Sequence, residues 1–361
     1  MPVVRAGPAR IIAPVQPSAD KPGGERHTVS IHDVAAAAGV SIATVSRVVN
    51  GTGVVAAATA ARVREAVQRL GYTPNPLAQV LGSGESHVLG IALPKFHGEF
   101  MSRLLSGADE EAARLGYHLI MTTITSRSDR HAGRGIVGSS LIDALLVVLT
   151  ETDDPLASTV LSAGLPTVVI DTDLSAKGLD SVVLDNERGT RDALDHLLRW
   201  VEPDKLYFVG GPRTNFDAAR RAGAFEEILL ARGHKPRPDQ VSFGDYSADW
   251  GKEWATRMHQ KGMLAGAVLA GNDKIACGIM RAAEDARVWV PDQLRVVGFN
   301  DSQLSQLVRP RLSTVSLPMD EMGALAVRTL VRRLENRDAP AICQRLTTKL
   351  VVRESSTAMN F

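Results

Sequence analysis

The sequence holds few cysteines and lacks any long apolar run. Its 361 residues include two cysteines, Cys277 and Cys343, and their wide separation indicates neither a disulfide framework nor a zinc site. No apolar stretch approaches the roughly 18 residues that a membrane-spanning helix requires. Residues 1–27 are rich in Pro and Gly and contain no sustained apolar core of a secretory signal. We therefore expect a disordered tail over 1–27 and a cytoplasmic protein without membrane contact, bound metal or cofactor.

A strong excess of charge of one sign is also missing, since the formal net charge of the chain is +1. The distribution of this charge is uneven. Residues 1–80 carry eight Lys and Arg but four Asp and Glu, which gives +4, and the remainder of the chain carries −3. A basic N-terminal part on an acidic remainder fits a protein that binds a polyanion at one end. A difference of a few charges is common, so this indication is weak by itself.

The stretch His32–Gly51, HDVAAAAGVSIATVSRVVNG, predicts two short helices joined at Gly39, with Ser41 as N-cap of the second. One face of the second helix holds valines, and the opposite face holds Ile42, Ala43, Ser46, Arg47 and Asn50. That face suits the base edges of DNA, because Arg can bond guanine bidentately and Ile or Ala can contact a thymine methyl. An ordinary helical hairpin with a solvated face explains the pattern about equally well.

Two further helical patterns follow this pair. Val63, Ala66, Val67 and Leu70 repeat at helical spacing before Gly71, which completes a compact unit at about 29–73. Residues 76–81 then predict a very short helix with two leucines on one face. Because isolated helices of this length are not stable in water, the segment needs a partner to order it.

From His87 onward, short strands rich in Val, Ile and Leu alternate with helical stretches. This alternation predicts parallel, doubly wound sheets, and its length favours two α/β lobes over one sheet. Ligands of such sheets bind beyond the carboxyl ends of the strands. The sequence places polar or glycine residues at these ends: Asp171, Gly210, Gly211, Asn272, Asp273, Asn300 and Asp301.

Taken together, these pieces closely resemble the LacI/GalR (lactose-repressor) family of bacterial transcription regulators. The resemblance runs from about Val29 to Ser355, and its most specific marks are IHDVAAAAGVSIATVSRVVNG, LGYTPNPLAQVL, ARRAG, GND, VVGFND and RPRLSTV. It implies an N-terminal all-α helix-turn-helix headpiece and an α/β, periplasmic-binding-protein-like sensor of two doubly wound lobes. The implied boundaries are 28–74 for the headpiece, 75–87 for the hinge helix and linker, 88–355 for the effector-binding and dimerisation domain (lobes at about 88–187 plus 317–345 and 188–316 plus 346–355), and 356–361 for a tail.

For the headpiece, the resemblance implies that the second helix enters the major groove of operator DNA. Base reading falls to Ile42, Ala43 and Arg47. Contacts with phosphates, or support of the docking, fall to Ser41, Thr44, Ser46 and Asn50. Leu81 stands at the hinge-helix position that enters the minor groove and bends the duplex; the alternative for Leu81 is a core contact.

For the sensor, the resemblance implies a small-molecule effector in the cleft between the lobes. The matching positions are Phe100, Met101, Asp171, Arg220, Tyr246, Asn272 and Asn300. A carboxylate, a guanidinium and side-chain amides suit the hydroxyls of a sugar. Structural alternatives stand beside these assignments: Asp171 and Asp301 as caps of turns or helices, Tyr246 and Trp250 as core residues, and Asp185 with Asn186 as a turn or cap. For Asp273 we favour a helix cap.

The chain departs from the family pattern at several points. The segment KFHGEFM follows the first strand, so Lys95, His97 and Glu99 put the choice of effector in doubt. Ala56 stands where the family has a serine that caps the third helix, which costs about 1 kcal/mol or less.

The sequence therefore predicts a dimeric repressor of double-stranded operator DNA, controlled by a sugar or sugar derivative. A purine or nucleoside effector, an activator role and a tetramer remain alternatives. An enzyme is disfavoured because the sequence has no Walker loop, GxGxxG, HExxH or CxxC motif. A pure solute-binding protein is disfavoured by the headpiece and by the lack of a signal peptide.

Overall fold

The computed structural model describes residues 29–50, 54–72, 86–94, 98–123, 141–151 and 164–357. The chain divides into a small unit within residues 1–79 and a larger unit within 80–361. The predicted tail over 1–27, the hinge helix with Leu81, and Lys95 and His97 lie outside the described residues. Within the described part of the chain, no helix has the length and apolar character needed to cross a membrane.

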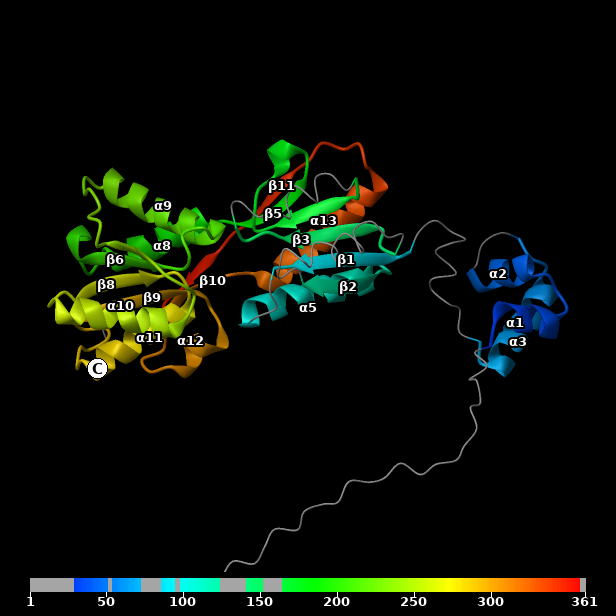
Figure 1. Cartoon of the computed structure of the whole chain (residues 1–361), viewed down its shortest axis with the longest axis horizontal. Helices are drawn as coiled ribbons and strands as arrows, with labels where there is room; N and C mark the ends of the chain where they lie inside the picture. Colours follow the sequence, from blue (N-terminus) through cyan, green and yellow to red (C-terminus); the bar gives the residue numbers. More distant parts are fainter. Residues whose placement is uncertain are drawn as a thin grey trace, which may run out of the picture. The chain divides into compact units, whose positions relative to one another are not determined.

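The small unit, which we call the headpiece, is a bundle of α1 (Ile31–Ala38), α2 (Ile42–Asn50) and α3 (Ala57–Leu70) (Figure 1). A capping box formed by Ser30 and Asp33 begins α1, and Gly39 ends it with a left-handed φ of 63°. The bundle core consists of Val34, Ala35, Ala38, Val45, Val63 and Ala66. Burying a valine contributes about 1.5–3 kcal/mol, so a few such residues hold this small core together. As predicted, Ala56 begins α3 without a side-chain cap.

The first lobe of the large unit is a parallel sheet in the order β11-β5-β4-β3-β1-β2. Two long helices, α5 (Gly98–Arg114) and α13 (Met319–Glu335), pack against each other beside this sheet (Figure 1). A side chain at Gly107 would lie 1.9 Å from the carbonyl oxygen of Asp320, so glycine is required where these helices meet. The elements are β1 Val88–Leu93, α5 Gly98–Arg114, β2 His118–Thr123, β3 Ala144–Val148, β4 Thr167–Ile170, the short 3-10 helix η1 Ser175–Lys177, β5 Asp180–Leu184, α13 Met319–Glu335 and β11 Cys343–Leu346.

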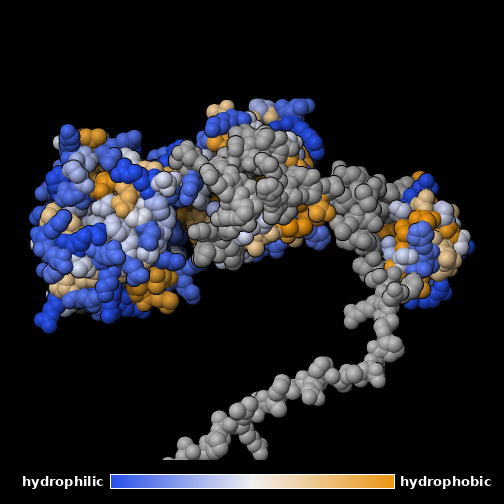
Figure 2. Space-filling view, in the orientation of Figure 1, coloured by the Kyte–Doolittle hydropathy of each residue, from blue (hydrophilic) through white to orange (hydrophobic). Residues whose placement is uncertain are grey.

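The second lobe is a sheet in the order β12-β10-β9-β8-β6-β7, parallel except for the pair of β10 and β12. Helices α8 and α9 pack together on one face, and α10 and α11 on the other (Figure 1). The visible surface of this lobe is mostly hydrophilic, with small hydrophobic patches (Figure 2). The elements are α8 Asn186–Leu197, η2 Pro203–Lys205, β6 Leu206–Gly210, α9 Phe216–Ala231, β7 Val241–Phe243, α10 Ala248–Gln260, β8 Gly266–Ala270, α11 Asp273–Asp285, β9 Leu294–Asn300, α12 Gln303–Leu307, β10 Ser313–Ser316 and β12 Lys349–Val351.

Alternating burial explains why these strands form sheets covered on both faces. Phe208 of β6 belongs to the core beneath α8 and α9, and the next residue, Val209, belongs to the core beneath α10 and α11. The chain passes between the lobes after β5, after β10 and after β11. The predicted fold class, a helical headpiece with a two-lobed α/β unit, is confirmed. The exact domain boundaries stay predictions.

Candidate functional site

The headpiece presents an exposed face on α2. Val45 is fully buried against the other two helices, and Val48 and Val49 are half-buried beside it. On the other side, Ser41, Ala43 and Arg47 are exposed, and Ile42 is 41% exposed, which is high for isoleucine.

The beginning of α2 is held by Ser41. Its Oγ accepts the backbone N–H of Thr44 at 3.3 Å and lies 2.9 Å from the Thr44 hydroxyl. Thr44 and Ser46 are half-buried, and the side chain of Asn50 lies outside the described set. The helix therefore brings most of the residues predicted to meet DNA onto one face.

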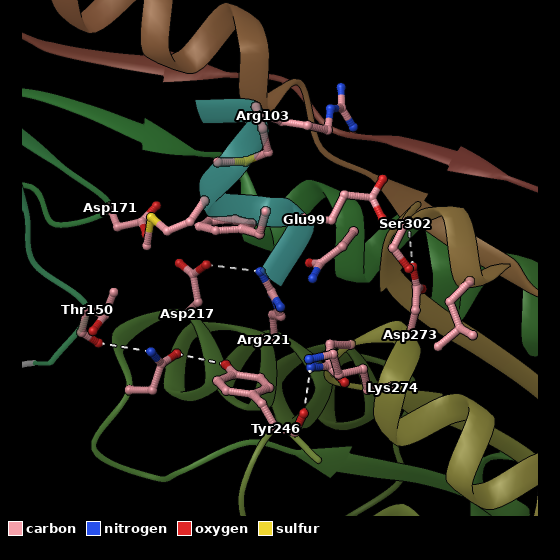
Figure 3. A pocket seen from close by; sticks show the side chains of 17 residues that line it. Glu99, Arg103, Thr150, Asp171, Asp217, Arg221, Tyr246, Asp273, Lys274 and Ser302 are labelled. Atoms are coloured by element: carbon pink, nitrogen blue, oxygen red, sulfur yellow. Dashed lines mark hydrogen bonds and ion pairs between the residues drawn. The ribbon is translucent and has the colours of Figure 1, made fainter. Parts of the chain in front are cut away.

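The second candidate site is a cavity of about 420 Å³ between the two lobes (Figure 3). It lies beyond the carboxyl ends of the parallel strands, where doubly wound sheets bind ligands. Its lining comprises Glu99, Phe100, Met101, Arg103, Thr150, Asp171, Asn215, Asp217, Arg221, Tyr246, Asn272, Asp273, Lys274, Asn300, Ser302, Leu304 and Met319. The cleft thus brings together six of the seven residues predicted to line it.

Asp171 directly follows β4 and is 4% exposed. Its backbone has a left-handed φ of 74°, a conformation that costs energy for a residue other than glycine and often marks a functional site. Its Oδ1 is buried and has no hydrogen-bond partner among the described residues. Burial raises the pKa of Asp171 well above its usual range, the nearby Asp217 carboxylate adds to this increase in pKa, and Arg221 opposes it.

Arg221 on α9 is 3% exposed and lies within a satisfied network. It donates from Nε to Oδ1 of Asn186 at 2.8 Å, from Nη1 to the carbonyl of Gly271 at 2.8 Å, and from Nη2 to Oδ2 of Asp217 at 3.0 Å. Asn186 in turn donates from Nδ2 to Oδ1 of Asp217 at 2.8 Å. The guanidinium also stacks 4.1 Å from the ring centroid of Phe299.

The prediction of Arg220 as a cleft residue is therefore corrected to Arg221. Successive helical residues point about 100° apart, so only one of two adjacent arginines can face the cleft. Arg220 points elsewhere, where its Nη1 lies 2.6 Å from Oε1 of Glu187 and its guanidinium stacks on Phe216.

The region at the start of α8 is partly as predicted. Asp185 is a helix cap, since its side chain accepts the backbone N–H of Arg188 at 3.1 Å. Asn186, assigned with it to a turn or cap, is instead a buried member of the Arg221 network. Nothing in the local sequence separates these two roles, because the partners of Asn186 are distant in the chain.

A chain of hydrogen bonds runs from Tyr246 through Asn215 to Thr150 in the other lobe. The Tyr246 hydroxyl donates to Oδ1 of Asn215 at 2.8 Å, and Nδ2 of Asn215 donates to the carbonyl of Thr150 at 3.0 Å (Figure 3). The same carbonyl accepts the backbone N–H of Phe216 at 2.9 Å. Burial raises the pKa of Tyr246, so its hydroxyl stays protonated and acts as a donor. Its ring packs on Gly211, where an added Cβ would lie 2.4 Å from Cζ of Tyr246.

Asn272 lines the cleft as predicted and also takes the cap role that we favoured for Asp273. Asn272 is the N-cap of α11, accepting the backbone N–H of Ile275 at 2.8 Å, while it also lines the cleft. Asp273 does not cap the helix; its carboxylate accepts bonds from the backbone and hydroxyl of Ser302 and from the hydroxyl of Thr314. Burial raises the pKa of Asp273 to about 6.

Two residues after β9 share the positive φ seen at Asp171. Asn300 has φ 109° and lines the cleft, and Asp301 has φ 53°. Asp301 is not a helix cap, because it pairs with Arg353 at 2.6 Å and accepts a bond from the hydroxyl of Ser305. Strained backbone therefore gathers at the strand ends around the cleft.

The N-terminal turn of α5 supplies the remaining wall. Phe100 and Met101 line the cleft, and Oε2 of the neighbouring Glu99 accepts the backbone N–H of Gln303 from the other lobe at 2.8 Å. A further link between the lobes joins Glu187 to Arg345 of β11 at 3.1 Å. Within the described ranges, no cluster of three His, Cys, Asp or Glu side chains could hold a metal ion.

Two family models match different parts of this chain. Residues 30–75 match the model for bacterial regulatory proteins of the lacI family, and residues 204–356 match the periplasmic binding protein-like domain. The catabolite control protein A of Priestia megaterium is 28% identical over 330 residues, which cover 91% of this chain and 99% of that protein. The HTH-type transcriptional regulator DegA of Bacillus subtilis (strain 168) is 30% identical over 337 residues, covering 92% and 99%.

Solved structures show the same similarity. The lac repressor dimer bound to operator and the anti-inducer ONPF is 28% identical, with a TM-score of 0.82 over 91% of this chain and 99% of that chain. The complex of the transcriptional regulator CelR with cellobiose is 27% identical, with a TM-score of 0.70 over 91% of this chain and 100% of that chain.

Proposed function

Because the chain belongs to the lacI family of bacterial regulatory proteins, we propose that it is a transcriptional repressor whose affinity for operator DNA is set by a sugar or sugar derivative. It is a DNA-binding transcription regulator of a ligand-responsive family. The observation that carries the finer proposal is the presence of two separate sites in one chain: an exposed face on α2 and a polar cleft between two lobes. Its working place is the cytoplasm, where operator DNA lies.

The face of α2 reads DNA in the major groove. Arg47 is exposed and carries the donors that guanine accepts, while Ile42 and Ala43 offer short apolar contacts for a thymine methyl. Ser41, Thr44, Ser46 and Asn50 fix the helix on the phosphates. Leu81 in the hinge enters the minor groove as a wedge.

The protein acts as a homodimer, so that two headpieces meet the two halves of a pseudo-palindromic operator. A two-fold symmetric protein reads two-fold related half-sites. The lac repressor dimer solved on its operator is a relative that assembles in this way.

The effector binds among Phe100, Met101, Asp171, Arg221, Tyr246, Asn272 and Asn300. Sugars expose apolar C–H faces and a rim of hydroxyls, and the cleft offers aromatic and apolar walls together with carboxyl and amide groups. The relative solved with cellobiose binds a carbohydrate. This supports a polyhydroxylated ligand over a purine or nucleoside.

Ligand binding reaches the DNA through the relative position of the lobes. Three contacts link the lobes: Thr150 with Asn215, Glu187 with Arg345, and Glu99 with the backbone of Gln303. An effector that weakens operator binding must itself bind less well to the DNA complex. A differential affinity of a few kcal/mol is sufficient for such a switch.

The experiment is a gel-shift titration of the full-length protein with DNA from its own promoter region. We expect one retarded species that contains two protomers and withstands excess unrelated DNA, and a footprint over two half-sites. Binding equal to that of unrelated DNA would contradict the regulator function and favour a solute-binding protein or an enzyme. If the bound protein recruits RNA polymerase and raises transcription, the result would favour an activator.

A further inference from the structure

We propose that Asp143 is a positioning residue that fixes the direction in which the headpiece linker leaves the first lobe, and that it thereby sets the separation of the two DNA half-sites that the dimer accepts. The linker is the chain between α3 and β1, and its last two residues are Ser86 and His87. The inference rests on the proposed function as a dimeric DNA-binding regulator. It concerns residues outside the lining of the cleft and outside the exposed face of α2.

Asp143 directly precedes β3, and its carboxylate accepts three hydrogen bonds from the end of the linker. Its Oδ1 accepts the backbone N–H of Ser86 at 2.7 Å and the Ser86 hydroxyl at 2.9 Å, and its Oδ2 accepts the backbone N–H of His87 at 2.7 Å. Hydrogen bonds to a charged acceptor are shorter and stronger than those between neutral groups. One side chain therefore holds both of the last residues of the linker, and we call these three residues the linker clamp.

The backbone adopts an unusual conformation at a residue that this carboxylate holds. His87 has a left-handed φ of 51°, which is uncommon for a residue other than glycine and needs support from its surroundings. Beside it, the Ser86 hydroxyl accepts the backbone N–H of Val88 at 3.1 Å, and the ring centroids of His87 and Tyr117 lie 5.5 Å apart. Contacts with the first lobe therefore set the path of the chain at this point.

The strand that follows Asp143 lies inside the sheet. Every residue of β3 is buried, and the strand is paired with β1 on one side and with β4 on the other. The backbone N–H of Asp143 also donates to the carbonyl of Val88 at 2.9 Å. Because protein interiors are close-packed, a strand in this position moves with the whole lobe. The linker clamp therefore ties the origin of the linker to the position of the first lobe.

The direction of the linker matters because two headpieces must meet one duplex. Each base pair added between the half-sites moves them apart by about 3.4 Å and rotates one relative to the other by about 35°. A linker with a fixed origin and direction reaches one separation well and its neighbours poorly. A linker that pivots freely reaches a range of separations, and its effective concentration varies smoothly with the span. Loss of the linker clamp should therefore flatten the preference for one spacing.

The test measures the affinity of the full-length protein for a series of duplexes. The centre of the footprint on the protein's own promoter DNA is shortened or lengthened by one and by two base pairs, the half-sites stay unchanged, and each duplex is titrated in a gel shift. For the wild type we expect a loss of roughly 10-fold or more in affinity for a change of one base pair, comparable to one mismatched contact. For Asp143→Ala we expect a loss of less than about threefold over the same series.

The relative preference separates this role from a structural one. A variant that is only less stable has fewer active molecules, which weakens its binding to every duplex by the same factor. Asp143→Asn is the second variant: its amide keeps an acceptor for Ser86 but turns an N–H donor toward the N–H of His87, so the preference should flatten here as well. Asp338→Ala removes an exposed charge from the same lobe, and this matched control should keep the wild-type preference.

Three results would overturn the proposal: a wild-type spacing preference in a folded Asp143 variant, equal binding of all spacings by the wild type, or failure of both variants to fold. The third result would make Asp143 a residue required for folding. If Asp143→Ala alone fails to fold, the preference of Asp143→Asn decides. If the wild type binds its promoter DNA no better than unrelated DNA, the proposed function fails, and this inference fails with it.

Discussion

Asp171 should lower the free energy of unfolding of the ligand-free protein. Its buried oxygen without a partner costs about 1–3 kcal/mol. Replacing Asp171 by Asn removes a carboxyl group that must take up a proton to be buried beside Asp217, and it keeps a side chain that suits φ 74°. We therefore expect Asp171→Asn to raise the melting temperature at pH 7 by roughly 2–6 °C. Binding residues often carry such a cost in stability.

The dependence on pH tests the cause of this gain. Because the pKa of Asp171 is raised in the folded protein, the native state holds a proton that the unfolded chain releases above its ordinary pKa of 3.8. The stability of the wild type therefore falls as pH rises above about 4. The advantage of Asp171→Asn should grow from pH 5 to pH 8 and shrink toward pH 4.

The assay is urea unfolding at several pH values, followed by tryptophan fluorescence. Asp301→Asn is the matched control, because Asp301 is paired with Arg353 at 2.6 Å and its replacement should destabilise the fold. A variant at Asp171 that is less stable than the wild type at pH 7, or a gain that does not change with pH, would refute the reasoning.

Three further predictions address the same unit. Arg221→Met should lower the free energy of unfolding in urea by about 3–5 kcal/mol, because it leaves Asp217 buried without its cation. Arg220→Met should lower it by less than about 1 kcal/mol, since that ion pair is one-third exposed, and equal losses would contradict the assigned orientations. Gly211→Ala should displace the ring of Tyr246 and abolish the effector response while operator binding persists, and a normal response in the gel shift would exclude Tyr246 from the site. Asp273, whose folded pKa is about 6, should lower stability by up to about 3 kcal/mol as pH rises from about 4 to 6, and Asp273→Asn should show a flatter profile in the same window.

The sequence allowed the fold class to be predicted because the signals are local and repeated. The valines of α2, the left-handed glycine after α1 and the alternation of buried strands with helices each reflect short-range periodicity. The polar residues after β4, β8 and β9 could be placed in one cleft, since the carboxyl ends of parallel strands share an edge.

The sequence could not decide which neighbouring side chain faces the cleft. Arg220 and Arg221 are alike in sequence, and only distant partners, Asn186 and Asp217, hold Arg221 inward. The cap role of Asp273 was wrongly predicted for a similar reason, because the hydroxyls that satisfy its carboxylate come from residues 302 and 314.

The sequence indicated the cleft residue Asn215 only weakly. Asn215 stands at a helix N-cap, and its contacts with Tyr246 and Thr150 appear only once the lobes are side by side.

The central claim is that the exposed face of α2 reads operator bases, and the most direct measurement is selection of preferred sequences from random duplex DNA by the wild type and by Arg47→Ala. We expect the wild type to select two related half-sites. Arg47→Ala should lose its preference at one base pair in each half-site, which corresponds to about 1–3 kcal/mol of binding free energy per contact. The control Arg69→Ala, an equal charge change on α3, should keep the wild-type preference. An identical selected sequence from wild type and Arg47→Ala, or no selection by the wild type, would contradict the account.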